Sequence, residues 1–86
     1  MPVIFLFYGI NITMYFGDHP PPHFHVITAE YAAKVAIENG SVIAGSLPKT
    51  AYNLVKRWAI INRDELAANW ERAMNDNPLH RIEGLK

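Results

Sequence analysis

The hydrophobic period changes once along this chain, close to residue 46, and that change constrains the fold more than any other feature. Residues 3–44 alternate apolar with polar side chains or form short β-branched and aromatic runs, which is typical of strands. From Pro48 onward, apolar residues recur every three or four positions, which is typical of amphipathic helices. A chain of 86 residues is long enough for one core. We therefore predict a single α+β domain over 1–86, with a strand-rich half at 1–45, two helices within 46–76 and a tail at 77–86.

The first half predicts an antiparallel sheet of about five strands. The expected strands are Val3–Tyr8, Ile10–Phe16, His23–Thr28, Tyr31–Glu38 and Ser41–Ala44. Val3–Tyr8 is apolar on both faces, so we expect it to be a central strand covered on two sides. Asn39-Gly40 favours a two-residue type I′ turn, in which both residues have positive φ.

The second half predicts a helical hairpin packed on one face of the sheet. The first helix is expected from about Pro48 to Ile61, with Ser46 as its N-cap. Asn62 and Glu65 have the spacing of a capping box that begins the second helix. Each helix has one apolar stripe to bury, so both should share the single core.

Composition excludes several classes of function. Eight basic and eight acidic residues give a formal net charge of +0, which disfavours dedicated DNA binding. The chain has no cysteine, so it lacks a thiol nucleophile, and a metal ion could be held only by histidine and carboxylate ligands. The same absence favours the cytoplasm. Val3–Tyr8 lacks the flanking residues of a signal peptide and is too short to span a membrane.

Three of the four histidines lie in the segment Asp18-His19-Pro20-Pro21-Pro22-His23-Phe24-His25. In a strand, residues two apart point to the same face, so His23 and His25 can converge on one ligand while Phe24 is buried behind them. His19 or Asp18 could supply a third ligand from the proline-stiffened loop. The candidate metal ligands are therefore His19, His23, His25 and Asp18, and the candidate ion is a divalent transition metal such as zinc.

Three interpretations of this histidine segment remain open. Three protein ligands would leave one coordination position vacant, as in catalytic zinc sites. Without metal, His23 and His25 could act as general base and general acid, for example in RNA cleavage, with His19 as a further catalytic candidate. Alternatively, the histidines and Asp18 could satisfy backbone groups that the prolines leave unpaired and so fix the loop.

A second candidate surface is basic. Its residues are Lys49, Lys56 and Arg63, at seven-residue spacing on the first predicted helix, and the neighbouring Arg57. A solvated helix face explains this line, and contact with RNA or with an acidic protein is the functional alternative. Acidic residues in the second helix argue against helix–turn–helix DNA reading. Trp58 and Trp70 fall on apolar stripes and are expected in the core.

Several motifs resemble one small prokaryotic, mainly bacterial, family, the domain of unknown function number 4160 (DUF4160). They are Phe7-Tyr8-Gly9-Ile10, Met14-Tyr15-Phe16, Asp18-His19 with Pro21-Pro22-His23-Phe24-His25, Gly45-Ser46-Leu47-Pro48, Leu54-Val55 with Trp58-Ala59, and Glu65-Leu66 with Asn69-Trp70. The resemblance implies a compact antiparallel sheet with two helices and no established reaction. Members of that family are often encoded beside, or fused to, a second small domain.

The resemblance therefore implies a small protein partner encoded nearby. From it we predict a binding or regulatory domain, part of a two-protein, toxin–antitoxin-like module, with the histidine segment as its candidate functional site. The alternative is an enzyme, either a metal-dependent hydrolase or a metal-independent ribonuclease that uses His23 and His25.

Overall fold

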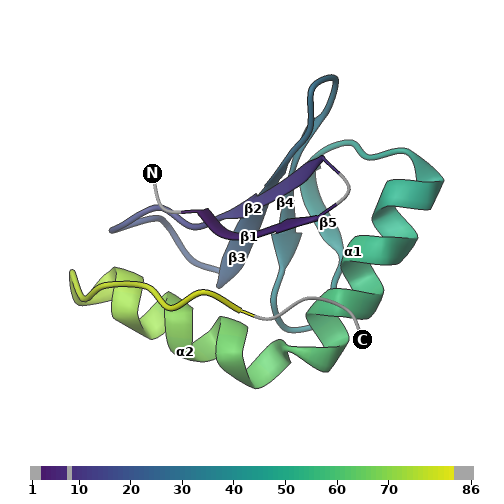
Figure 1. Ribbon diagram of the computed structural model, residues 1–86. Coiled ribbons are helices and arrows are strands. Elements are labelled where there is room, and N and C mark those ends of the chain that lie inside the picture. Colours follow the sequence, from purple (N-terminus) through teal and green to yellow (C-terminus); the bar gives the residue numbers. More distant parts are fainter. Residues whose placement is uncertain (1–2, 8, 83–86) are drawn as a thin grey trace.

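The computed structural model of the chain describes residues 3–7 and 9–82. Its seven elements are β1 (Val3–Phe7), β2 (Ile10–Thr13), β3 (His23–Ile27), β4 (Ala32–Ala36), β5 (Val42–Gly45), α1 (Lys49–Ile61) and α2 (Arg63–Met74). The strands form one antiparallel sheet in the order β1-β2-β3-β4-β5, and the two helices follow it (Figure 1). The predicted α+β class is confirmed.

The sheet is a meander in which each strand pairs with the next one in sequence. The first strand therefore lies at an edge, and the prediction that Val3–Tyr8 forms a central strand was wrong. Short connections make sequential strands neighbours, so the first strand of a meander has only one partner. Tyr8 lies outside the described residues. The central strand is β3, which carries His23 and His25.

The core lies between one face of the sheet and the helices. Ile12, Phe24 and Val35, from three neighbouring strands, are fully buried together with Trp58 of α1. The rings of Phe24 and Trp58 meet edge to face, with centroids 5.9 Å apart. Trp70 of α2 joins the same cluster, so both tryptophans are core residues, as predicted. The side chains of His23 and His25 lie on the opposite face of β3.

The helices do not form a hairpin. They meet at a bend, and α2 runs on beneath the strands (Figure 1). Only Asn62 separates them, whereas helical hairpins need about two to five loop residues. Both the backbone N–H and the side-chain amide of Asn62 donate to the carbonyl of Trp58, so Asn62 caps α1 and makes no capping-box bond for α2. The predicted cap at Ser46 was also wrong, because α1 begins after Pro48 without a side-chain cap.

The predicted strands Ile10–Phe16, His23–Thr28 and Tyr31–Glu38 are longer than the observed β2, β3 and β4. The alternation from Ile10 continues to Phe16, but β2 ends at Thr13 and Phe16 is 47% exposed. The chain leaves the sheet here because the Gly17 N–H donates to the carbonyl of Ala73 in α2. Tyr31, predicted to begin the fourth strand, precedes β4 and is exposed.

The turn between β4 and β5 is longer than the predicted two-residue type I′ turn. Gly40 has a φ of +73°, but Asn39 does not have positive φ. Ile37 leaves the ladder to enter the core, so the turn spans 37–40 and closes with a bond from the Gly40 N–H to the Ala36 carbonyl. The Asn39 side chain accepts the Ser41 N–H within this turn.

The tail after α2 packs back along that helix (Figure 1). Asn69 is fully buried, and its amide group bonds both the N–H and the carbonyl of His80. Ile82 is buried and Leu79 is partly buried against the core. Within the described part of the chain, no helix is long and apolar enough to cross a membrane.

Candidate functional site

The loop after β2 brings Asp18 against the start of the central strand. Two backbone bonds fix this loop to the rest of the fold: the Gly17 N–H donates to Ala73 of α2 at 3.2 Å, and the Ile37 N–H donates to Pro22 at 3.1 Å. Three consecutive prolines, the last of them the anchoring Pro22, restrict φ and so limit loop motion. The position of Asp18 is therefore set by tertiary bonds on both sides of it.

Asp18, His23 and His25 form one compact group. Oδ2 of Asp18 lies 3.0 Å from Nε2 of His23 and 2.9 Å from Nε2 of His25. One ligand atom from each of the three residues falls within 4.8 Å of the others. The two imidazoles share a face of β3 because they are two residues apart, and Phe24 between them is fully buried in the core, as predicted.

His23 is held in one orientation. It is only 4% exposed, and its ring packs against Trp70 with a centroid distance of 5.3 Å. Its Nδ1 lies 2.8 Å from the carbonyl of Pro21, which can only accept, so Nδ1 carries a proton. Nε2 then faces the Asp18 carboxylate. Because an unprotonated Nε2 and a carboxylate oxygen are both acceptors, this contact requires a proton on Nε2 or a cation between the two atoms. This tautomer, with Nδ1–H on a backbone carbonyl, is the one that metal-bound histidines adopt.

His25 is the accessible member of the group. Its side chain is 17% exposed, and the ring of Tyr15 contacts it edge-on with centroids 4.4 Å apart. The rings of His23 and His25 lie 5.1 Å apart. A ligand from solvent would therefore reach this group beside His25 and not through the buried His23.

The Asp18 side chain is ionised over the whole physiological pH range. Partial burial raises its pKa, but the hydrogen bond from His25, the hydrogen bond from the His19 N–H and the nearby imidazoles outweigh that effect and lower the pKa from 3.8 to about 2. The carboxylate is thus a permanent anion toward which both Nε2 atoms point. Such an anion suits either imidazolium partners or a metal ion.

Thr13 is a further polar residue at this site, and no motif in the sequence marks it. It pairs directly with His25 across the β2–β3 ladder, so their side chains share a face. Thr13 is 1% exposed, and its hydroxyl has no hydrogen-bond partner. Alternation in β2 already placed Thr13 on the face away from the core, but only the strand register shows that His25 is its neighbour.

His19 does not join the group. The residue is exposed, and it contributes its backbone N–H, which donates to Oδ1 of Asp18 at 2.8 Å. The loop turns the Asp18 side chain inward and leaves His19 facing solvent. Of the four candidate ligands, the described structure therefore gathers Asp18, His23 and His25.

The four basic candidates are exposed, but they do not form one line. Arg63 is the first residue of α2, so only Lys49, Lys56 and Arg57 share α1. The Lys56 ammonium lies 5.8 Å from the centre of the Tyr52 ring. The bend at Asn62 separates Arg63 from the other three.

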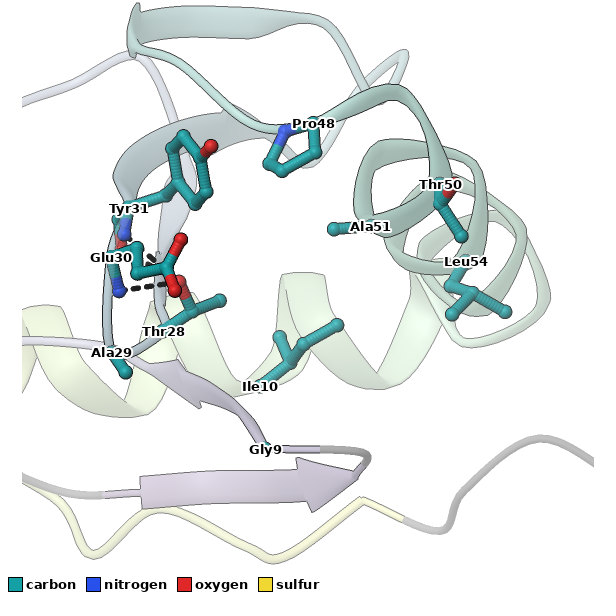
Figure 2. A pocket seen from close by; sticks show the side chains of 10 residues that line it. All are labelled: Gly9, Ile10, Thr28, Ala29, Glu30, Tyr31, Pro48, Thr50, Ala51 and Leu54. Carbon is teal, nitrogen blue, oxygen red and sulfur yellow. Dashed lines mark hydrogen bonds between the residues drawn. The ribbon is translucent and has the colours of Figure 1, made fainter.

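A separate cavity of about 510 Å³ lies between β2, the β3–β4 turn and the first turn of α1 (Figure 2). Its wall is largely apolar, with Ile10, Ala51 and Leu54 among the lining residues. The Thr28 hydroxyl accepts hydrogen bonds from the N–H groups of Glu30 and Tyr31 and so stabilises the β3–β4 turn. Glu30 is the one charged residue in the lining, and among the described residues the cavity holds no group of histidine and carboxylate ligands.

The fold and site define a small α+β domain in which two histidines of the central strand meet one carboxylate from the loop that precedes it. The chain belongs to the family described as Domain of unknown function (DUF4160), whose model matches residues 9–71, including every member of that group. Searches of curated proteins and of solved structures gave no match.

Proposed function

We propose that this chain is a metal-binding domain in which Asp18, His23 and His25 hold a divalent transition ion, with zinc as the first candidate. The observation that carries the proposal is the convergence of both Nε2 atoms on Oδ2 of Asp18, with Nδ1 of His23 already committed to a carbonyl. Two imidazoles and one carboxylate are a recurrent ligand set for zinc and iron.

The distances fit an ion after a small rearrangement. Ligands about 2.0–2.1 Å from a tetrahedral zinc lie roughly 3.3 Å from one another. The contacts of His23 and His25 with Asp18 are 3.0 and 2.9 Å, so these two pairs of ligand atoms need to separate by about 0.3–0.4 Å, and all three ligand atoms lie within 4.8 Å of one another. The Thr13 hydroxyl opposite His25 is a separate support, because it is buried and has no hydrogen-bond partner. Such a hydroxyl costs free energy unless a bound group satisfies it. An ion-bound water molecule would be such a group.

The same geometry disfavours a metal-free ribonuclease. General acid and general base must stand on opposite sides of the reacting phosphate, whereas both rings here point at one carboxylate. His23 is also almost fully buried and tied to Pro21. A metal-dependent hydrolase is compatible with the proposed ion, because three protein ligands leave a position for water.

Zinc titration by calorimetry tests the proposal. The wild type should bind one ion per chain, and His23→Ala/His25→Ala should lose more than about 100-fold in affinity, since loss of an outer partner alone costs about 10–100-fold. His19→Ala is the matched control and should bind as the wild type does. Equal affinity in the wild type and the double variant at neutral pH would mean that these residues fix the loop and hold no metal.

We further propose that the domain acts with a small protein partner, as one half of a toxin–antitoxin-like module, and that it does so in the cytoplasm, in keeping with its cysteine-free composition. The supporting observation is a pair of apolar side chains at the helix junction, Ile60 and Ile61, which are 61% and 62% exposed. Contiguous exposed apolar patches mark interaction sites, and two adjacent exposed isoleucines can form part of one. RNA contact through the basic face of α1 is a weaker proposal.

Co-expression with the adjacent gene product tests the partner. A stoichiometric complex should co-purify, and Ile60→Asp/Ile61→Asp should release the partner without changing zinc affinity. Independent elution of the two wild-type proteins at micromolar concentration would refute this part of the proposal.

A further inference from the structure

A single row of side chains crosses the sheet at the level of the proposed ion. The strand registers pair Thr13 with His25, His25 with Lys34, and Lys34 with Ala44. Directly paired residues of antiparallel strands point to the same face, with their Cα atoms about 4.5–5.5 Å apart. Lys34 is therefore the immediate neighbour of His25, on the side away from Thr13.

A groove begins at His25 and follows this row. Its volume is about 270 Å³, and Tyr15, Ile27, Lys34 and Ala44 are among its lining residues. Its floor is low because Ala32 and Ala44 are small and Gly45 has no side chain. A Cβ at Gly45, whose φ is +76°, would collide with the carbonyl of Ala32, so this position cannot accept a larger residue without distortion. His25 is thus both a member of the ion-binding group and one wall of the groove.

The groove is electropositive once an ion is bound. Lys34 is exposed, and among the residues that the structure describes no carboxylate pairs with it. The lining contains no arginine, aspartate or glutamate and no other lysine. The two positive charges of the ion exceed the single negative charge of Asp18, and Lys34 adds another positive charge beside them. This charge balance favours a ligand that carries negative charge.

We infer that the groove binds a small oxyanion, a phosphate or carboxylate group, which reaches the open position of the ion beside His25 and is paired by the Lys34 ammonium. This inference rests on the metal site proposed above and names the ligand class of that site. The groove volume of about 270 Å³ lies just below the usual range for ligand pockets, about 300–1,000 Å³, so the ligand is small. The apolar floor of Ala32, Ala44 and Ile27 accommodates a short apolar body attached to the anion.

Cobalt-loaded protein gives a direct test, because an anion that enters the coordination sphere changes the visible spectrum of Co²⁺. Sulfate and acetate are the probes, and they distinguish a tetrahedral oxyanion from a carboxylate. Cobalt affinity is measured first for the wild type, for Lys34→Met and for Lys49→Met. Lys49 is an exposed lysine on α1, away from this face, so its variant is a control of identical charge change.

We expect all three proteins to bind cobalt with similar affinity. One of the two anions should then change the wild-type and Lys49→Met spectra at about the same concentration, while Lys34→Met should need at least about tenfold more anion, as expected for loss of a charge-assisted hydrogen bond. The inference is overturned if the cobalt protein forms but neither anion changes its spectrum, or if Lys34→Met responds as the wild type does. Failure of the wild type to bind cobalt would instead refute the metal site.

Discussion

Replacement of Asp18 by asparagine isolates the carboxylate that joins the two histidines. The substitution keeps the size and shape of the side chain but removes the negative charge to which both Nε2 atoms point. An amide oxygen still accepts a hydrogen bond, but it cannot stabilise a protonated imidazole or a metal ion to the same degree. Asp18→Asn should therefore destabilise the fold in the absence of metal and abolish zinc binding.

The magnitude follows from the pKa of Asp18. A fall from 3.8 to about 2 corresponds to roughly 2.4 kcal/mol, at about 1.4 kcal/mol per tenfold change in proton affinity. The carboxylate is 17% exposed, so solvent screens part of this, and we expect about 1–2 kcal/mol. Because the folded-state pKa is the lower one, this stabilisation is present above about pH 4 and is lost as the pH falls toward 2.

Urea unfolding, followed by the fluorescence of the two core tryptophans, measures the effect. At pH 5 the metal-free wild type should be more stable than Asp18→Asn by about 1–2 kcal/mol, and the difference should shrink steadily between pH 4 and pH 2. Asp76→Asn is the control, since Asp76 is exposed with a φ of +56°, which asparagine also adopts. A difference that stays constant from pH 5 to pH 2.5 would refute the assignment of the charge to this contact.

Three further predictions concern the same face and the turn beyond it. Thr13→Val should stabilise the metal-free protein by about 1–2 kcal/mol in urea unfolding, because it removes an unpaired buried hydroxyl, and it should weaken zinc binding in calorimetry. Destabilisation of the metal-free protein would show that the hydroxyl is satisfied. Gly40→Val should lower the free energy of unfolding by about 1–3 kcal/mol without changing zinc affinity, because φ is +73° and a Cβ would lie 3.2 Å from Cγ of Lys56. An unchanged melting temperature would contradict this. Zinc affinity should fall between roughly pH 7 and pH 5.5, because protons compete for the imidazole nitrogens, and a flat profile would argue against histidine ligands.

Local rules predicted the part of the site that lies within one strand. Period two aligned His23 with His25 and sent Phe24 into the core, and these three positions needed no knowledge of the remaining fold. The orientation of His19 depends on the loop, which is fixed by bonds from Gly17 and Pro22 to distant parts of the chain. Such tertiary anchors leave no periodic signal in the sequence.

The remaining differences have the same origin. Lys34 became a neighbour of His25 only through the β3–β4 register, which single-strand patterns do not specify. Asparagine is common at helix N-caps, but Asn62 hydrogen-bonds to the preceding helix. A single residue between the two helices is also too short a connection to reverse the chain direction. Ile37 extended a turn because burying its side chain outweighed the preference of Asn39-Gly40 for a tight hairpin.

The most direct test of the proposed site is a long-range proton–nitrogen NMR spectrum of the histidine rings, recorded before and after one equivalent of zinc. On zinc addition, His23 and His25 should both show Nε2 shifted by coordination and Nδ1 still protonated, with Nδ1–H of His23 on the Pro21 carbonyl. His19 and His80 should remain unchanged. Coordination through Nδ1 of His23, a zinc-dependent shift at His19, or unchanged spectra of His23 and His25 would contradict the proposed site.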